Sequence, residues 1–167
     1  MPDGLYERDA LAWAEQQADL LRRLAAGERL NASVDWPNVI EEVRDVGLSE
    51  LRACQSLLEQ ALRHLLKQHA WPASRAVAYW REETGVFLDD AARRFTPSMR
   101  QRIDLDDLYT AALRRTRAVT DDAGAPRPLL EACPFTLEEL LSADVARLSG
   151  KLGSATTCAV SEQKNES

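Results

Sequence analysis

The sequence predicts an all-α fold, a compact helical bundle of four main helices with two or three short ones. Apolar residues recur at spacings of three and four along most of the chain, which is the helical period. No segment alternates apolar and polar residues over a useful length, as a half-buried strand would. Proline, glycine and capping residues fall between the apolar rows and set the expected helix ends.

The first helix is expected over residues 5–26, with an apolar side that includes Trp13. A short helix should follow over 35–47, with Asp35 as its N-cap. Its expected inward residues are Trp36, Val39, Ile40 and Val43. Gly47 suits a left-handed residue that ends this helix.

Residues 49–70 carry the most apolar row, which we expect to form the centre of the core. Its members are Leu51, Cys54, Leu58, Ala61, Leu62 and Leu65. Pro72 should stop this helix, because proline lacks the backbone donor that a helix interior needs. The next helix is expected over 74–95, with Trp80 facing inward.

A short turn of helix is expected at 98–103, and a further helix over about 104–122. Thr136 followed by Glu139 predicts a capping box and a short last helix. From Gly150 the chain has few bulky apolar residues and no clear period, so we expect a disordered tail. The predicted organisation is one helical domain over 1–149 and a tail over 150–167.

The charge and the termini bear on partners and compartment. A net charge of -6 argues against nucleic acid, because phosphate contacts need clustered cations. No apolar run reaches the length of a membrane span, so we expect no membrane partner. The acidic N-terminus does not fit a signal peptide, which predicts a cytoplasmic protein. The three cysteines are widely spaced, which argues against a disulfide framework or a zinc finger.

Both histidines lie in the stretch ALRHLLKQHAWP, at His64 and His69. Residues five apart on an α-helix point about 140° apart, so the two cannot bind one metal ion from a regular helix. We expect no metal and no cofactor. His69 aligns with the leucine row and should pack at its end. His64 is either a hydrogen-bonded packing residue or the one plausible acid-base group near neutral pH.

Two other stretches allow a functional and a structural interpretation. Glu41 and Glu42 are adjacent and point in different directions, and the Glu-x-x-His signature of carboxylate-bridged bundles is absent. A solvated acidic face is the simpler interpretation of this pair. Trp80 is followed by Arg81 and two glutamates, so it could line a small-molecule pocket or fill the core.

The order of several motifs resembles the bacterial family called domain of unknown function 29. These motifs are LYERDALAWAEQQADLLR at 5–22, DWPNVIEEV at 35–43, HLLK at 64–67, the helix around Trp80, and CPFTLEELL at 133–141. The resemblance covers about residues 5–145 and implies a compact helical bundle, with no established activity. Family members tend to carry an aromatic residue directly after HLLK, where this chain has Gln68.

If such a family has a functional site, the residues of this chain at its motif positions are the candidates. They are Asp9, Trp13, Glu41, Glu42, His64, Lys67 and Trp80. The resemblance assigns none of them a role.

Two functions remain open from the sequence. The first is a small non-enzymatic helical module that binds another protein, in a regulatory or adaptor role, or associates with itself through leftover apolar rows. The alternative is a small-molecule-binding protein or enzyme. It would have a polar pocket around His64, with Glu41 or Glu42 and Trp80 close by.

Overall fold

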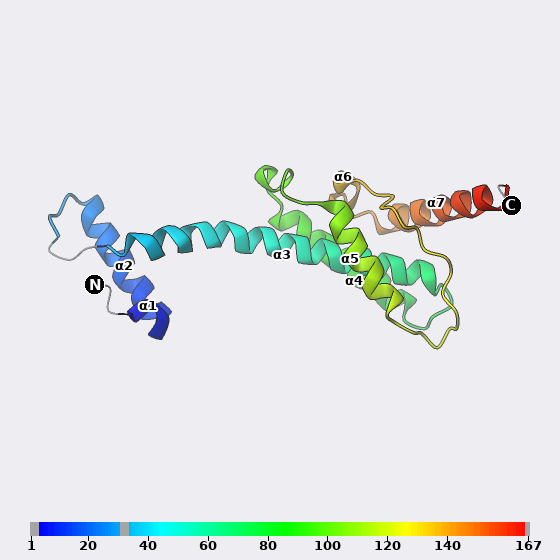
Figure 1. Cartoon of the computed structure of the whole chain (residues 1–167), viewed down its shortest axis with the longest axis horizontal. Helices are drawn as coiled ribbons and strands as arrows, with labels where there is room; N and C mark the ends of the chain where they lie inside the picture. The colour runs from blue at the N-terminus through cyan, green and yellow to red at the C-terminus, as the bar shows by residue number, and fades with distance from the viewer. Residues whose placement is uncertain (1–3, 31–33, 166–167) are drawn as a thin grey trace. The chain divides into compact units, whose positions relative to one another are not determined.

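The computed structural model describes residues 4–30 and 34–165, and helices joined by loops make up these ranges (Figure 1). The helices are α1 (Leu5–Arg8), α2 (Ala10–Ala25), α3 (Trp36–Ala70), α4 (Val77–Arg94), α5 (Leu105–Arg117), α6 (Leu137–Leu141) and α7 (Val145–Asn165), with a 3-10 turn at Pro97–Met99. In the described ranges no strand forms; one isolated bridge joins Asp121 to Gly124. The predicted all-α class is therefore confirmed.

The chain divides into two compact units, residues 1–49 and residues 50–167. Helix α3 supplies its first 14 residues to the first unit and the remainder to the second. Each unit is described by itself below. The single domain expected over 1–149 stays a prediction.

The first unit contains α1, α2 and the first part of α3 around a small core. Trp13, Leu20, Val34 and Val39 form this core. The single helix expected over 5–26 is interrupted at Asp9, whose φ of -154° is not helical. The Asp9 carboxylate accepts a hydrogen bond from the backbone N–H of Ala12 at 3.0 Å, so Asp9 caps the start of α2.

Helix α3 continues through Gly47, where the sequence predicted an end between two helices. Gly47 is not among the residues with positive φ, so it is an ordinary helical residue. A glycine inside a helix costs roughly 1 kcal/mol relative to alanine, which weakens a helix without ending it. Helix α3 ends at Ala70, and Pro72 follows as predicted.

The second unit is built on the leucine row of α3. Every member of the row predicted between Leu51 and Leu65 is buried, and Leu58, Ala61 and Leu62 are completely inaccessible. The other helices of this unit pack on the row through Leu88, Ala91, Tyr109, Ala112, Leu140, Leu148 and Leu152. The predicted centre of the core is confirmed.

Hydrogen bonds hold the connections of the second unit against its helices. The Trp71 indole donates to the carbonyl of Gly124 at 2.9 Å, and the Tyr109 hydroxyl donates to the carbonyl of Leu130 at 3.0 Å. These bonds attach the segment between α5 and α6 to the helices. The capping box predicted at Thr136 and Glu139 is present at the start of α6.

The structure differs from the disordered tail expected from Gly150. Helix α7 continues to Asn165, and residues 166 and 167 of the expected tail lie outside the described residues. Leu152 is completely buried and Thr156 is 7% exposed. Few apolar residues lie in this segment, but Leu152 continues the buried side that Leu148 begins one turn earlier, and both belong to the core of this unit.

A second difference concerns the apolar row at the start of α3. Of the residues expected to face inward, Val39 is buried, while Trp36 is 51%, Ile40 64% and Val43 71% exposed. The period of the row was predicted correctly, but the core of the first unit uses only its edge. No helix in the described part of the chain is long and apolar enough to span a bilayer.

We expect Leu152→Ala to lower the free energy of unfolding of the second unit by about 2–5 kcal/mol, because it leaves a cavity in a fully buried position. Urea unfolding followed by circular dichroism measures this change. The matched control is Ser154→Ala, an exposed position of the same helix, which should change stability by less than about 0.5 kcal/mol. Equal unfolding of both variants would mean that α7 does not pack on the core.

Candidate functional site

In the first unit, polar side chains converge on Asp35, directly before α3. The Trp13 indole donates to Asp35 Oδ2 at 3.2 Å, and the Asn38 side chain donates to the same oxygen at 2.7 Å. The backbone N–H of Asp35 donates to Gln17 Oε1 at 2.9 Å, and Gln17 is buried. The Asn38 side chain lowers the pKa of Asp35 most, and the Trp13 indole lowers it further. This network connects α2 to the start of α3.

Tyr6 and Glu42 form a second link in the same unit. The Tyr6 hydroxyl donates to Glu42 Oε1 at 2.7 Å, and the Tyr6 ring packs edge-on against Trp13, with 4.9 Å between ring centroids. The hydrogen bond to Glu42 is the main cause that raises the pKa of Tyr6 to about 12. Glu42 therefore accepts a bond that positions α1, while the neighbouring Glu41 is exposed.

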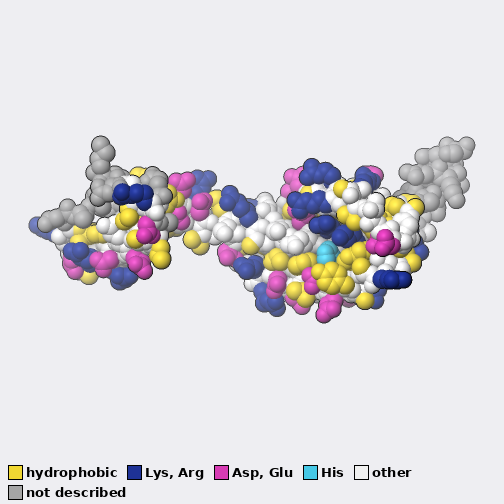
Figure 2. Space-filling model, turned by 90° about the horizontal axis from the view of Figure 1, so that it is seen from below, with side chains coloured by type: hydrophobic (Ala, Val, Ile, Leu, Met, Phe, Trp, Pro, Cys, Tyr) yellow, Lys and Arg dark blue, Asp and Glu magenta, His cyan; other side chains and the backbone are white. Residues whose placement is uncertain are grey.

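In the second unit, His64 is half-buried against aromatic rings of α4. Its ring centroid lies 5.4 Å from that of Phe87 and 6.2 Å from that of Tyr79. Figure 2 shows a histidine side chain on the surface of this unit beside hydrophobic and basic side chains. Burial lowers the pKa of His64 to about 4, and the positive charges of Lys67 and Arg63 act in the same direction. The imidazole is therefore neutral near pH 7.

Lys67 and Trp80 contact each other beside this histidine. The Lys67 ammonium lies 5.5 Å from the centroid of the Trp80 ring, a cation–π arrangement. Burial lowers the pKa of Lys67, and the nearby charge of Arg63 adds to the effect. Trp80 is 7% exposed and packs near Trp71. It therefore lies in the core, as the structural interpretation of this residue expected.

Gln68 occupies the position where the family pattern favours an aromatic residue. It is buried and donates from Nε2 to Thr84 Oγ1 at 2.9 Å and to the Trp80 carbonyl at 3.3 Å. The Thr84 hydroxyl donates to that same carbonyl at 2.6 Å. Gln68 therefore joins α3 to α4 by hydrogen bonds.

The seven candidate residues fall into two sets, one in each unit. Asp9, Trp13, Glu41 and Glu42 belong to the first unit, and His64, Lys67 and Trp80 belong to the second. In the described residues no group of three His, Cys, Asp or Glu side chains is placed to bind a metal ion.

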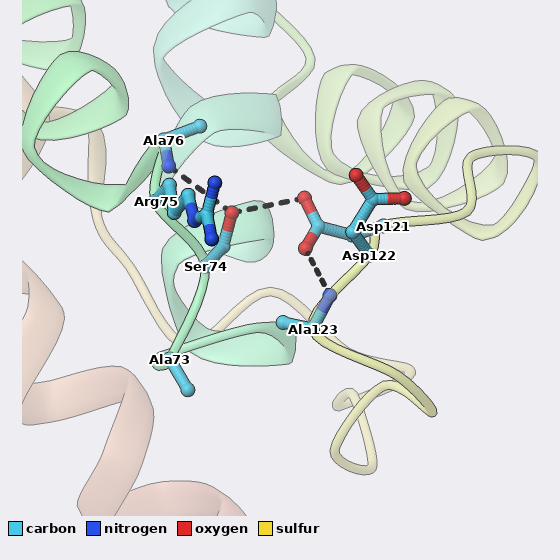
Figure 3. Close-up of a pocket in the computed structure, with 7 residues that line it drawn as sticks. All are labelled: Ala73, Ser74, Arg75, Ala76, Asp121, Asp122 and Ala123. Carbon is cyan, nitrogen blue, oxygen red and sulfur yellow. Dashed lines mark hydrogen bonds between the residues drawn. The ribbon is translucent and has the colours of Figure 1, made fainter.

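An open pocket of about 410 Å³ lies in the second unit, between the turn after α3 and the loop after α5 (Figure 3). Ser74 donates to Asp121 Oδ2 at 2.9 Å, and the backbone N–H of Ala123 donates to Asp121 Oδ1 at 2.8 Å. The bond from Ser74 joins the two loops, and the bond from Ala123 holds the turn of the second loop itself. Arg75 and Asp122 complete the polar wall, and none of the seven candidates lines this pocket.

The sequence analysis did not single out the pocket residues or the network around Asp35. Asp35 was expected only as an N-cap, and Gln17 was not considered. The one available signal was the adjacent pair Asp121 and Asp122 before a glycine, which is typical of a turn. Such a turn gives no indication of which loop will lie opposite.

The family model described as "Domain of unknown function DUF29" matches residues 5–146. The chain belongs to this family. The match confirms the resemblance seen in the sequence motifs, and it covers most of both units. A comparison of this DUF29 chain with curated proteins gave no match.

A solved structure similar to this DUF29 chain is an α-helical protein of unknown function from Rhodospirillum rubrum ATCC 11170. The two are 29% identical and superpose with a TM-score of 0.66. The similarity covers 89% of this chain and 97% of the other. It supports the helical fold and assigns no activity.

We expect the stability of the protein to decrease as the pH falls from about 6.5 to about 4, and His64→Phe to reduce this dependence. In this window the unfolded chain takes up a proton on His64 that the folded protein does not bind, so acid favours unfolding. Urea unfolding at several pH values measures the effect.

The pKa of His69 is also lowered by burial, so His69→Phe is the matched control and should remove a separate part of the dependence. A nuclear magnetic resonance titration of the imidazoles assigns the contributions. A pKa near 6.5 for His64 in the folded protein would contradict the expectation.

Proposed function

We propose that this DUF29 protein is a protein-binding module, and that it binds through the exposed apolar row at the start of α3. We define this row as Trp36, Ile40 and Val43, with Gly47 at its end. At about 100° per residue these four positions lie within an arc of roughly 60° on the helix surface. The single observation that carries the proposal is the exposure of the three large side chains, each more than half accessible.

The location of the exposed apolar residues supports this proposal. The large apolar side chains that are exposed in the described residues are Leu11, Leu24, Trp36, Ile40, Val43, Val46, Tyr79 and Val86. Half of them lie between residues 36 and 46, where Val46 borders the row. Single exposed apolar residues are ordinary on protein surfaces, but a contiguous group usually marks an interaction site.

The core of the first unit leaves the row uncovered. Val39 packs against Trp13 and Leu20, and Glu42 accepts the bond from Tyr6. Both positions lie on the side of α3 next to the row, at least about 40° away from it. The row thus has helical regularity and no function in the core of its own unit.

The alternative, a pocket around His64, Glu41 or Glu42 and Trp80, has less support. Glu42 is bonded to Tyr6, Trp80 is buried in the core, and Lys67 lies over its ring. A neutral His64 could serve as a base, but its ring is packed against Phe87 and Tyr79. These contacts favour structural functions for the second set of candidates.

Site-specific photo-crosslinking in living cells tests the proposal. A photoreactive amino acid replaces Ile40 in one variant of the full chain and Asp45 in the control. Both positions are exposed on α3 but point about 140° apart. We expect a discrete protein adduct from position 40 and none from position 45. Absence of adducts at position 40, or equal labelling from both positions, would contradict a protein-binding row.

A further inference from the structure

The row on α3 has a pattern of side-chain sizes that identifies a specific occupant. Its positions are 36, 40, 43 and 47, and the outer two and the inner two share the same midpoint, between residues 41 and 42. If an identical helix packs antiparallel across this midpoint, position 36 faces position 47 and position 40 faces position 43. The row is therefore complementary to itself under a two-fold axis.

The side chains at the paired positions fit this arrangement. Trp36, the largest member, faces Gly47, the smallest, and Ile40 faces Val43. A Cβ placed on Gly47 would meet no atom within 4 Å, so the surface there is open to an incoming indole. A parallel pair in register would instead place the two indoles against each other and leave a gap at the two glycines. The antiparallel pair fills space evenly, as close packing requires.

The charges beside the row are also compatible with a second copy. No charged residue lies in the row itself. Arg44, which is exposed, lies along one edge, about 70° from the centre of the row, whereas Glu41 points about 130° away from that centre. Because the row contains no charged side chain, its contact with a second copy brings no like charges together.

The other edge of the row can add to the surface area that a dimer buries. In an antiparallel pair each edge faces the same edge of the partner helix, so Val46 lies near the second copy's Val39, against which α2 packs. An exposed patch of three large apolar side chains is on the order of a few hundred Å². A stable interface buries about 800 Å² on each partner. Contacts of Val46 with the α2 helix of the second copy supply further area.

We infer that the occupant of the row is a second copy of this chain, packed antiparallel so that Trp36 faces Gly47 and Ile40 faces Val43. This inference rests on the proposed function, because it names the partner of the same surface. The protein is then a two-fold symmetric dimer in which two copies of α2 and the first parts of two α3 helices form one four-helix assembly.

Sedimentation velocity of the full chain tests the inference. The unmodified protein should sediment as a dimer, with about twice the mass of one chain. The Ile40→Glu and Val43→Arg variants should each sediment as monomers. A dimer of either variant would bury two charges of the same sign, one from each copy, without partners in the apolar interface. The control, Asp45→Arg, changes an exposed residue on the far side of α3 and should remain a dimer. Unchanged circular dichroism spectra exclude misfolding, since positions 40 and 43 are exposed within the unit.

Mixing the two monomeric variants tests the register. In the inferred register, the carboxylate introduced at position 40 of one chain faces the guanidinium introduced at position 43 of the other, and the second contact stays apolar. The mixture should therefore regain the dimer. In a parallel pair the introduced carboxylate would face Ile40 of the other chain, and the introduced guanidinium would face Val43. Neither charge would then be paired, and the mixture would stay monomeric. A dimeric unmodified protein whose mixed variants stay monomeric would overturn the register.

A monomeric unmodified protein would overturn the second copy as the occupant. The proposed function survives that result if position 40 crosslinks to a different protein, and it fails if position 40 crosslinks to none. The two experiments therefore separate failure of the dimer from failure of the binding surface.

Discussion

Burial of the leucine row on the second part of α3 is the interaction on which the second unit depends. Leu58 and Leu62 are completely inaccessible, and helices α4, α5, α6 and α7 all contribute side chains that pack on this row. The row lies entirely after Gly47, in the part of α3 that belongs to this unit.

Some polar groups that the packing buries have hydrogen-bond partners inside the protein, and Trp13, one of the family motif positions, is an example. The buried Gln68 bonds to Thr84 and to the Trp80 carbonyl, and the indole of Trp13 bonds to Asp35. An unpaired buried donor or acceptor costs about 1–3 kcal/mol, comparable with a fifth of the stability of a small domain. A motif residue can thus be needed for folding without taking part in chemistry.

The sequence predicted more of the fold than of the candidate site. The apolar period located the long helices and the row from Leu51 to Leu65, because burial and period are directly related. The predicted boundary at Gly47 was wrong. A glycine raises the free energy of a helix only slightly, so tertiary packing decides whether the helix continues. The apolar period did not reveal the docking of α7, which buries Leu148 and Leu152. For the candidate site, the motif selected residues of two separate units, and the functions of Trp13 and Glu42 follow from hydrogen-bond partners that are distant in sequence.

The two parts of α3 show what an apolar period can and cannot predict. Both carry large apolar side chains at spacings of three and four, and from the sequence both were expected to face a core. The chain itself covers the second part, through Leu88, Tyr109 and Leu152, but covers only Val39 at the edge of the first. An apolar period indicates that a helix surface needs a packing partner, but it does not indicate which partner. The order of sizes along the row carries that further information, because a tryptophan and a glycine placed symmetrically about an isoleucine and a valine fit a copy of themselves.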